Sequence, residues 1–255
     1  MAASYPLSDI QHRTQTVQRN LVTVVVPALN EAAGIGRTLA SVAFQPGPVQ
    51  VVVVDGGSTD GTAEAARRAL PSAEVVSGTR GRAQQMNAGA AHGRGGALVF
   101  LHADTALPAD ALDRVRRALS DPTVAGGCFE TTFDQTAPPG ERAFGPLGRA
   151  FMRLWEARLW MRWHRFAFGD RALFVRRDVF DAVGGFPDQP IFEDLDFVRA
   201  VRGRGGFAFL DAAVVTSARR YRQGGAVRQQ LRNLGLWAAW NVGVPPRRLK
   251  RFYPD

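Results

Sequence analysis

The sequence predicts an α/β fold in which a mainly parallel sheet carries helices on both faces. Three observations predict it: four short apolar runs recur within the first 120 residues, each is followed by a segment of helical character, and polar residues gather directly after the runs. An uninterrupted apolar run is typical of a strand buried on both faces, as in a parallel sheet. Right-handed crossovers between such strands place helices on both faces of the sheet.

The first half predicts strands and helices in alternation. The first strand, LVTVVVPA, is rich in β-branched residues, and Asn30 is a candidate N-cap for the helix after it. Ser58, Thr59 or Asp60 can cap the second helix. Pro108 opens the fourth helix, where its missing N–H costs nothing. The predicted strands span 21–28, 49–55, 73–78 and 97–101, and the predicted helices span 31–42, 62–70, 82–93 and 109–120.

The second half is less regular, with neither a repeat nor a clear linker, so we assign it to the same domain. Strands are predicted at 123–134 and 172–177, and one or two more between 206 and 221. Helices are predicted at 141–166, 178–186, 194–205 and 226–244.

The composition fits a soluble cytoplasmic protein. Cys128 is the single cysteine among 255 residues, so no internal disulfide can form, which fits a reducing compartment. Residues 1–19 are polar, unlike a secretory signal, and we expect a disordered lead-in there. The longest apolar runs fall well short of the roughly 20 residues that span a bilayer.

The net charge of +9 comes mainly from arginine, which accounts for 31 of the 32 basic residues. This excess can steer an anionic ligand or a membrane surface toward the protein. It does not indicate nucleic acid, because no recognition-helix, zinc or RNA-binding motif accompanies it.

Polar residues follow the ends of the predicted strands. They lie at 27–31, 55–60, 80–82 and 102–104. The carboxyl ends of parallel strands meet at one edge of a sheet, which is where open α/β sheets bind ligands. His102 and Asp104 are two positions apart in an extended chain, so their side chains point the same way and can face one ligand. The alternative is a simple polar turn.

Two nucleotide-binding loops are excluded. The first strand is followed by PALNEAAGIGRTL, which holds Gly34 and Gly36 but has Leu39 where a dinucleotide-binding loop needs its third glycine. No Walker lysine pattern occurs either. The phosphates of a bound nucleotide must therefore be held by a metal ion and arginines.

Four motifs in order carry a resemblance to a known family: VTVVVPALNEAAGI, VVVVDGGSTDGT, GRAQQMNAGAAHGRGGALVFLHADTALP and GGFPDQPIFEDLDFVRAV. Over roughly residues 20–220 the chain resembles the family 2 glycosyltransferases of GT-A fold. It is similar to a small bacterial subgroup with LHADT in place of the usual Asp-x-Asp, a subgroup associated with arsenosugar biosynthesis.

The resemblance implies a Rossmann-like, mainly parallel sheet flanked by helices, with a smaller acceptor-side half. Residues 20–255 would form one domain: a nucleotide-sugar-binding half at 20–120, an acceptor and catalytic half at 121–220, and a C-terminal amphipathic helix and tail at 221–255.

For the donor, the resemblance implies that Asp55 accepts a hydrogen bond from the uracil ring of a UDP-sugar. Pro27, Ala28 and Glu31 would line the base and ribose. Two alternatives remain open. Glu31 can be a first-turn acid favoured by the helix dipole, and Asp55 can be an ordinary turn carboxylate.

Several basic residues match positions near the nucleotide in the family. Arg82 would face the pyrophosphate, which guanidinium groups bind through paired hydrogen bonds, whereas we expect Arg80 to be solvated. Arg219 and Arg220 can also meet the pyrophosphate, the alternative being a solvated basic loop. Asn87 matches an asparagine that supports the loop.

Asp104 takes the position of the last Asp of Asp-x-Asp, and His102 stands where the family usually has the first. Asp104 would hold Mn²⁺ or Mg²⁺ between the two phosphates. Imidazole suits Mn²⁺ better than Mg²⁺, and His102 can instead hydrogen-bond the ribose or a phosphate.

The Glu-Asp pair of the family falls on Glu193 and Asp194. Asp194 would be the general base for the acceptor hydroxyl, because clustered acids raise one another's pKa values and keep some basicity near neutral pH. The alternative is that these acids simply begin a helix, where negative charge is favoured. We expect Asp196 to be structural.

The acceptor side is less specific. Gly169 and Asp170 match the segment that flanks the acceptor site and would contact the sugar or the acceptor. Trp and Arg residues at 154–165 and in the C-terminal helix suit a peripheral membrane contact with a lipid-linked acceptor, and they equally suit internal packing or a homodimer contact. We favour packing, and a structural role for His164.

Together these inferences predict an inverting glycosyltransferase that uses a UDP-sugar and a small-molecule or lipid-linked acceptor. A sugar-phosphate nucleotidyltransferase would need a Gly-rich loop bearing Arg or Lys after the first strand, and PALNEAAG is not one. A non-catalytic nucleotide-sugar-binding or membrane-surface module would have no need for a base.

Overall fold

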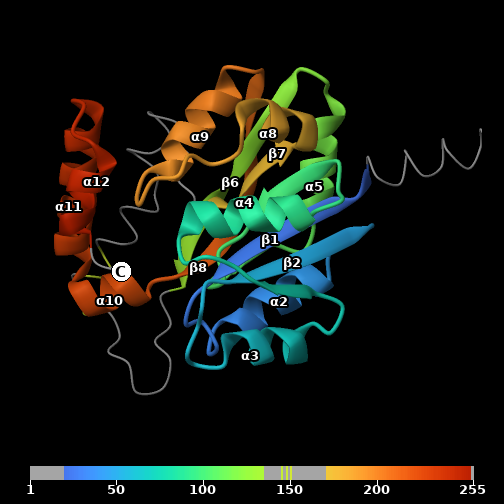
Figure 1. Ribbon diagram of the computed structural model, residues 1–255, viewed down its shortest axis with the longest axis horizontal. Helices are drawn as coiled ribbons and strands as arrows, with labels where there is room; N and C mark the ends of the chain where they lie inside the picture. Colours follow the sequence, from blue (N-terminus) through green and yellow to red (C-terminus); the bar gives the residue numbers. More distant parts are fainter. Residues whose placement is uncertain (1–19, 135–144, 146–147, 149, 151–170, 254–255) are drawn as a thin grey trace, which may run out of the picture.

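The protein is represented by a computed structural model, which describes residues 20–134, 145, 148, 150 and 171–253. In these residues, eight strands form one sheet in the order β3-β2-β1-β4-β7-β6-β8-β5 (Figure 1). The strands are β1 Val22–Ala28, β2 Val49–Asp55, β3 Glu74–Ser77, β4 Ala97–Phe100, β5 Thr105–Ala106, β6 Val124–Asp134, β7 Leu173–Arg176 and β8 Gly206–Ser217. The predicted lead-in and most of the predicted helix at 141–166 lie outside the described residues.

The sheet is mainly parallel, as predicted. β1, β2, β3 and β4 run parallel, and β6 runs parallel to β8. β7 lies antiparallel between β4 and β6, and short β5 is antiparallel to β8. The register pairs Ala28 with Asp55 and Asp55 with Ser77, so the carboxyl ends of three strands lie side by side. The polar segments after them therefore meet at one edge, as predicted.

Helices cover both faces of the sheet. The first face carries α2 Ile35–Ala43, α3 Thr62–Ala69 and α5 Ala111–Ser120. The second carries α4 Arg82–His92, α8 Arg177–Val183 and α9 Glu193–Arg202. The C-terminal helices α10 Arg219–Gly224, α11 Ala226–Asn241 and α12 Pro246–Leu249 and the 3-10 turn Lys250–Phe252 lie to one side of the sheet (Figure 1).

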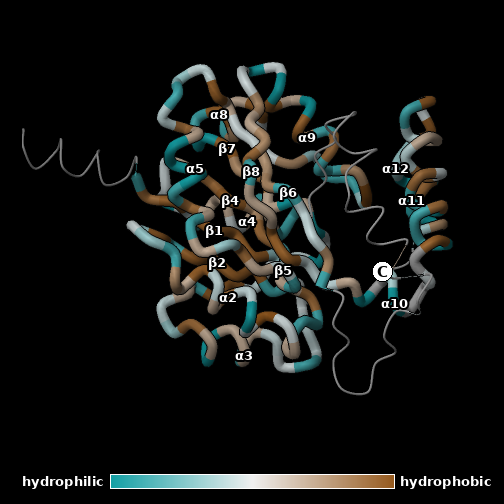
Figure 2. The backbone as a smooth tube through the Cα atoms, turned by 180° about the vertical axis from the view of Figure 1, so that it is seen from behind, coloured by the Kyte–Doolittle hydropathy of each residue, from teal (hydrophilic) through white to brown (hydrophobic). Residues whose placement is uncertain are grey.

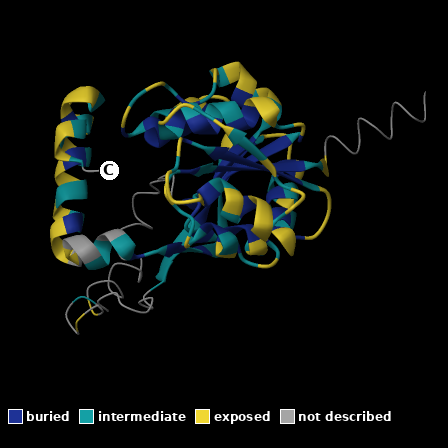
Figure 3. Cartoon of the chain, turned by 60° about the horizontal axis from the view of Figure 1, so that its bottom comes forward, coloured by how far each residue is buried: buried dark blue, intermediate teal, exposed yellow. Residues whose placement is uncertain are grey.

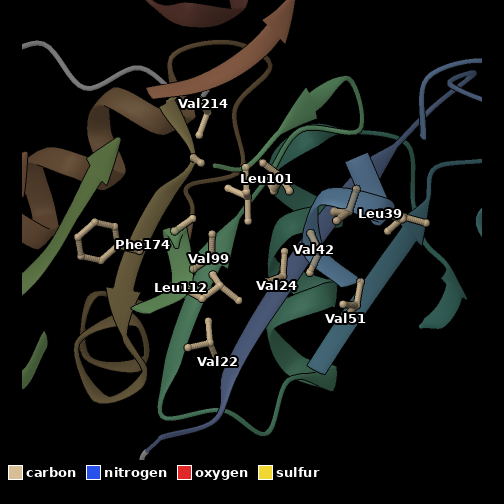
Figure 4. Close-up of a cluster of buried hydrophobic side chains, with 14 of the residues drawn as sticks. Val22, Val24, Leu39, Val42, Val51, Val99, Leu101, Leu112, Phe174 and Val214 are labelled. Carbon is tan, nitrogen blue, oxygen red and sulfur yellow. The ribbon is translucent and has the colours of Figure 1, made fainter. Parts of the chain in front are cut away.

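Among the described residues, one large apolar cluster lies on each face of the sheet. β1 contributes to both, because Val24 packs into the first cluster and Val25 into the second. Figure 4 shows Leu39, Val51 and Leu112 with other members of the first cluster. Figure 2 shows the hydrophobic central strands, and Figure 3 shows that they are buried. An uninterrupted valine run is stable only in a strand covered on both faces, which is why this sequence forms a central strand.

Two of the predicted helix starts are wrong. Asn30 does not cap α2: its φ is 55°, and the helix begins only at Ile35 after a turn. α5 begins at Ala111 and not at Pro108, because the Pro108 carbonyl accepts the Ala111 N–H at 3.1 Å and forms a turn before the helix.

The cap predicted for α3 is partly right. Gly61, at φ 83°, is the N-cap residue, and as a glycine it has no side chain to cap the helix. Asp60 nevertheless accepts the Thr62 N–H at 3.1 Å through Oδ1.

The segment predicted as one or two strands at 206–221 is a single strand followed by a helix. β8 ends at Ser217, and Arg219 and Arg220 begin α10. β5 is also absent from the sequence prediction, since two residues are too few for a detectable pattern.

Candidate active site

Two loops at the carboxyl edge of the sheet are tied together by side-chain hydrogen bonds. Asn30 donates its backbone N–H to Ser58 Oγ at 2.9 Å, and its Oδ1 accepts the Thr59 N–H at 2.9 Å. The Ala32 N–H is bonded to Asp60 Oδ2 at 3.0 Å. These bonds explain why Asn30 is not a helix cap, because its amide is engaged by the neighbouring loop.

Asp55 ends β2 within this pair of loops. Its carboxylate accepts the backbone N–H of Ser58, 3.2 Å from Oδ1, and the Ser58 hydroxyl. Asp55 therefore does act as a turn carboxylate, which was the alternative to a contact with the nucleotide base. Pro27 is half-buried beside it, whereas Ala28 is packed into the core.

Gln85, which the sequence analysis did not single out, joins the ends of β1 and β2. It is 4 % exposed, and its Nε2 donates to the carbonyls of Ala28 at 2.8 Å and Val54 at 2.9 Å. Gly56 makes room for it, because a Cβ there would lie 2.9 Å from Nε2. The sequence signal that could have identified Gln85 is its position between Ala83 and Met86, which are apolar and buried in α4.

We expect Gln85→Leu to lower the free energy of unfolding by about 2 kcal/mol, because two hydrogen bonds of about 1 kcal/mol each are lost. For a chain of this size, that lowers the melting temperature by about 4–8 °C. Calorimetric or fluorescence melting measures this. Gln84→Leu is the matched control, because the partner of Gln84 is the exposed Asp188. Equal melting temperatures for the two variants would contradict a tethering role for Gln85.

Glu31 forms a forked ion pair with Arg219. Arg219 Nη2 lies 2.5 Å from Glu31 Oε1, and its Nη1 lies 3.3 Å from Oε2. Glu31 precedes α2 by four residues, so it is not a first-turn acid. The pair joins the loop after β1 to the helix after β8, and it brings a guanidinium to the carboxyl edge. Arg219 is therefore not a residue of a solvated loop.

The LHADT segment is held between α2 and β8. The Ala103 carbonyl accepts the Thr38 hydroxyl at 2.8 Å, and the Asp104 carbonyl accepts the Ser217 N–H at 3.1 Å. Asp104 Oδ1 lies 3.5 Å from the Thr216 hydroxyl. These contacts fix the position of a half-buried carboxylate just past the end of β4.

Asp104 and His102 fit a cation that is bound together with a phosphate ligand. Among the residues that the structure describes, no group of three or more His, Cys, Asp or Glu side chains forms a metal site. Mg²⁺ and related ions at nucleotide sites commonly use one or two carboxylates plus phosphate oxygens, so the donor set is chemically suitable.

The opposite side of α4 holds the loop that leads to the acid pair. Asn87 forms two hydrogen bonds with the backbone of Phe186, at 2.8 and 2.9 Å. Arg82 Nη1 lies 3.4 Å from Glu193 Oε1. α4 thus connects the ends of β1 and β2 to the start of α9.

The acid pair is buried at the start of α9. The Glu193 side chain is 3 % exposed, and Asp194 is buried and accepts the Leu195 N–H at 2.8 Å. Burial raises the pKa of the Glu193 carboxyl; Arg82 opposes the rise, and Asp194 adds to it. Phe192 reaches this helix start with φ 63°, a left-handed conformation that is costly for a bulky residue. Glu193 and Asp194 do stand in the first turn of α9, as the helix-start alternative describes, and they are also buried.

We expect Glu193→Gln to stabilise the protein relative to wild type increasingly as pH rises. Because the folded-state pKa is raised, the stability that Glu193 contributes is fully present below its unfolded pKa and is lost as pH rises through the folded pKa. The difference in melting temperature between variant and wild type should grow from pH 4.5 to pH 8. Glu64→Gln, in the exposed first turn of α3, is the control. A difference that is constant with pH would contradict the prediction.

The other predicted site residues are placed as follows. Asp196 contacts Gln189 and Arg199, in keeping with a structural role. The side chain of Arg220 lies outside the described part of the chain, as do Gly169, Asp170 and His164.

Comparisons with known proteins show the family to which the chain belongs. A model of the family described as "Glycosyl transferase family 2" matches residues 23–183. The chain belongs to this family. The glycosyltransferase AglE of Haloferax volcanii is 31 % identical over 180 residues, which cover 67 % of this chain and 57 % of AglE. The 4,4'-diaponeurosporenoate glycosyltransferase of Staphylococcus aureus is 33 % identical over 111 residues, 41 % of this chain and 30 % of that protein.

Solved structures show the same GT-A fold. The mannosyltransferase PcManGT of Pyrobaculum calidifontis, in complex with GDP-Man and Mn²⁺, has a TM-score of 0.60 and 26 % identity, covering 91 % of this chain and 67 % of PcManGT. S. aureus TarS 1-349 in complex with UDP has a TM-score of 0.57 and 16 % identity, covering 91 % and 69 %.

The match covers part of the length of these relatives. The chain spans about a third to somewhat over half of the length of the curated relatives that it matches. No helix in the described residues is long and apolar enough to cross a bilayer.

Proposed function

We propose that this family 2 protein is an inverting glycosyltransferase that moves a sugar from a UDP-sugar to an acceptor hydroxyl, with Asp194 as the general base. The observation that carries the proposal is the contact of Arg82 with Glu193, because it ties the acid pair to the helix that holds the ends of β1 and β2. This connection supports the proposal that the donor and the base act at the same edge of the sheet.

The donor would lie across the loops after β1 and β2. Asp55, Pro27 and Glu31 are at this edge, and the solved structures of PcManGT and TarS are complexes with GDP-Man and with UDP. We assign the uracil contact to Asp55 and the pyrophosphate contacts to Arg82 and Arg220. The Ala28 side chain is in the core, so we assign this residue only a backbone role.

In the proposed reaction, the acceptor hydroxyl attacks the anomeric carbon from the side opposite the departing UDP. Asp194 takes the hydroxyl proton, a new C–O bond forms and the bond to the β-phosphate oxygen breaks, so the configuration inverts. Glu193 holds Arg82 beside the acid pair, with 3.4 Å between Oε1 and Nη1. Gly169 and Asp170 stay proposals for the acceptor side.

Asp104, with His102 beside it, would hold a divalent cation, and Mn²⁺ suits this donor set. Such a cation, when bound, neutralises charge on the departing diphosphate. The cytoplasm is the compartment that we propose, from the single cysteine.

Titration calorimetry with UDP, and with GDP as control, tests the donor class. We expect UDP to bind more tightly than GDP and to need Mn²⁺ for full affinity. UDP release from UDP-glucose and UDP-N-acetylglucosamine then distinguishes an enzyme from a binding module. Preferential binding of GDP would overturn the UDP assignment, and binding without any turnover on any acceptor would favour the module.

A further inference from the structure

The C-terminal segment carries a one-sided charge. Between 212 and 254 the sequence has no Asp or Glu. Over the same length it has these basic residues: Arg219, Arg220, Arg222, Arg228, Arg232, Arg247, Arg248, Lys250 and Arg251. The segment is thus strongly cationic without internal neutralisation, and it is built around α11 and α12.

One face of α11 packs on the catalytic part of the chain. Leu236 is buried with Ile191 and Leu249. Trp240 lies 5.5 Å from Phe192, between ring centroids, and the Arg199 guanidinium lies 4.7 Å from the Trp240 ring. This inner face therefore rests directly on the residues that precede Glu193.

The outer face of α11 is apolar and exposed. Val227, Leu231, Leu234 and Ala238 follow each other at intervals of four, three and four residues, so they form one stripe along the helix. Leu231 is 64 % exposed. Figure 3 shows α11 beside the body of the protein with exposed residues along its length. A helix packed on a soluble protein ordinarily turns polar side chains to solvent, whereas α11 carries apolar side chains on its outer face as well as on its inner face.

Exposed arginines accompany this stripe in α11 and in the turns that follow it. Arg228 follows Val227 on the helix, and Arg247, Arg248 and Arg251 come from the turns after it. All four are exposed, and none forms an ion pair within the part of the chain that the structure describes. Exposed Phe252 adds an apolar side chain beside Arg251.

We propose that this C-terminal surface, made of the α11 stripe, the four arginines and Phe252, docks on an anionic lipid bilayer. Apolar side chains would enter the interface, and each arginine near an anionic surface adds about 1 kcal/mol of attraction. Trp237 on the same helix is of a residue type that favours the membrane interface. Packing alone, which the sequence analysis favoured for this helix, accounts only for its inner face.

Charge argues against a second copy of the chain as the occupant. A two-fold dimer through this surface would bring identical cationic segments together, and like charges across an interface are unfavourable. An anionic bilayer instead complements both the charge and the apolar stripe. Docking there would hold the loop at 191–193 close to the membrane, because the inner face of α11 packs on it.

Vesicle flotation tests the proposal with the full chain. We expect binding to vesicles of phosphatidylcholine with phosphatidylglycerol, weak binding to phosphatidylcholine alone, and release by salt. Arg247→Gln, Arg248→Gln and Arg251→Gln combined should weaken binding roughly 100-fold. Leu231→Asp with Leu234→Asp should also weaken it, by at least about tenfold.

Matched controls separate this surface from general effects. A control variant with Arg67→Gln, Arg68→Gln and Arg117→Gln removes the same amount of charge from another surface. These three arginines are exposed on α3 and α5. Phe44→Asp changes an 83 % exposed apolar residue at the end of α2. Both controls should bind vesicles like wild type, and melting curves verify the folding of all variants.

Three results would overturn the proposal. The first is no binding to anionic vesicles by folded protein. The second is an equal loss of binding in the control variants. The third is a dimer in light scattering that the Leu231→Asp, Leu234→Asp variant dissociates, which would assign the stripe to a second copy. UDP binding and donor turnover are measured without vesicles, so failure of this proposal is distinct from failure of the proposed function.

Discussion

Replacing Asp194 with Asn is expected to lower the rate of sugar transfer by about 10²–10⁴-fold and to leave the affinity for UDP unchanged. Asn has nearly the same shape but cannot accept the acceptor proton. The backbone contact with Leu195, at 2.8 Å, uses an oxygen that Asn also has, so the start of α9 should be preserved. Release of UDP from a UDP-sugar and calorimetric titration of UDP measure the two quantities.

Asp178 provides a matched control for this prediction. It stands in the first turn of α8, and its carboxylate accepts the N–H of the next residue, Val179, at 2.9 Å, as Asp194 does with Leu195. Asp178→Asn should have normal turnover and stability. Normal turnover in Asp194→Asn would mean that the assigned base is wrong. Loss of UDP binding would mean that Asp194 serves the donor and not the acceptor.

Replacing Asp104 with Asn is expected to abolish the metal-dependent part of UDP affinity, a loss of about 100-fold or more in the presence of Mn²⁺. The carboxylate is the one full negative charge of the HAD segment, and an amide is a much poorer partner for Mn²⁺. Affinity without Mn²⁺ should change little. The segment should stay in place, because its anchors to Thr38 and Ser217 are backbone carbonyls.

Asp110, exposed at the start of α5, is the control for charge. Asp110→Asn should keep the full response to Mn²⁺. If the Asp104→Asn variant still gains affinity for UDP from Mn²⁺, the cation is bound elsewhere. Paramagnetic broadening of NMR signals, on adding Mn²⁺ to EDTA-treated protein, would then locate that site.

The central strands could be predicted because their signal is local. Val24 and Val25 point to opposite faces and both are buried, so the continuous apolar run by itself indicates a covered parallel strand. The same reasoning placed Asp55 and the HAD segment at one edge, since parallel strands bring their carboxyl ends together. Glu193 and Asp194 were predicted as site residues from the order of the family motifs, and their roles stay proposals.

The contacts that assemble the site could not be predicted, because they join residues far apart in the chain. Glu31 and Arg219 are 188 positions apart, and no periodicity links them. The polar Gln85 stands among apolar positions of α4, but the sequence does not reveal that its partners are the carbonyls of Ala28 and Val54. The left-handed conformation of Phe192 is likewise imposed by packing and not by its own preference.

By itself, then, the sequence determined the α/β class, the parallel central strands and the edge at which polar groups gather, because burial and strand direction follow from local patterns. The tertiary structure alone decided that β7 enters antiparallel between β4 and β6 and that α4 tethers both loops and acids. It also decided that α11 turns its apolar stripe outward. These outcomes depend on which distant surfaces meet, and that is settled by packing of the whole chain.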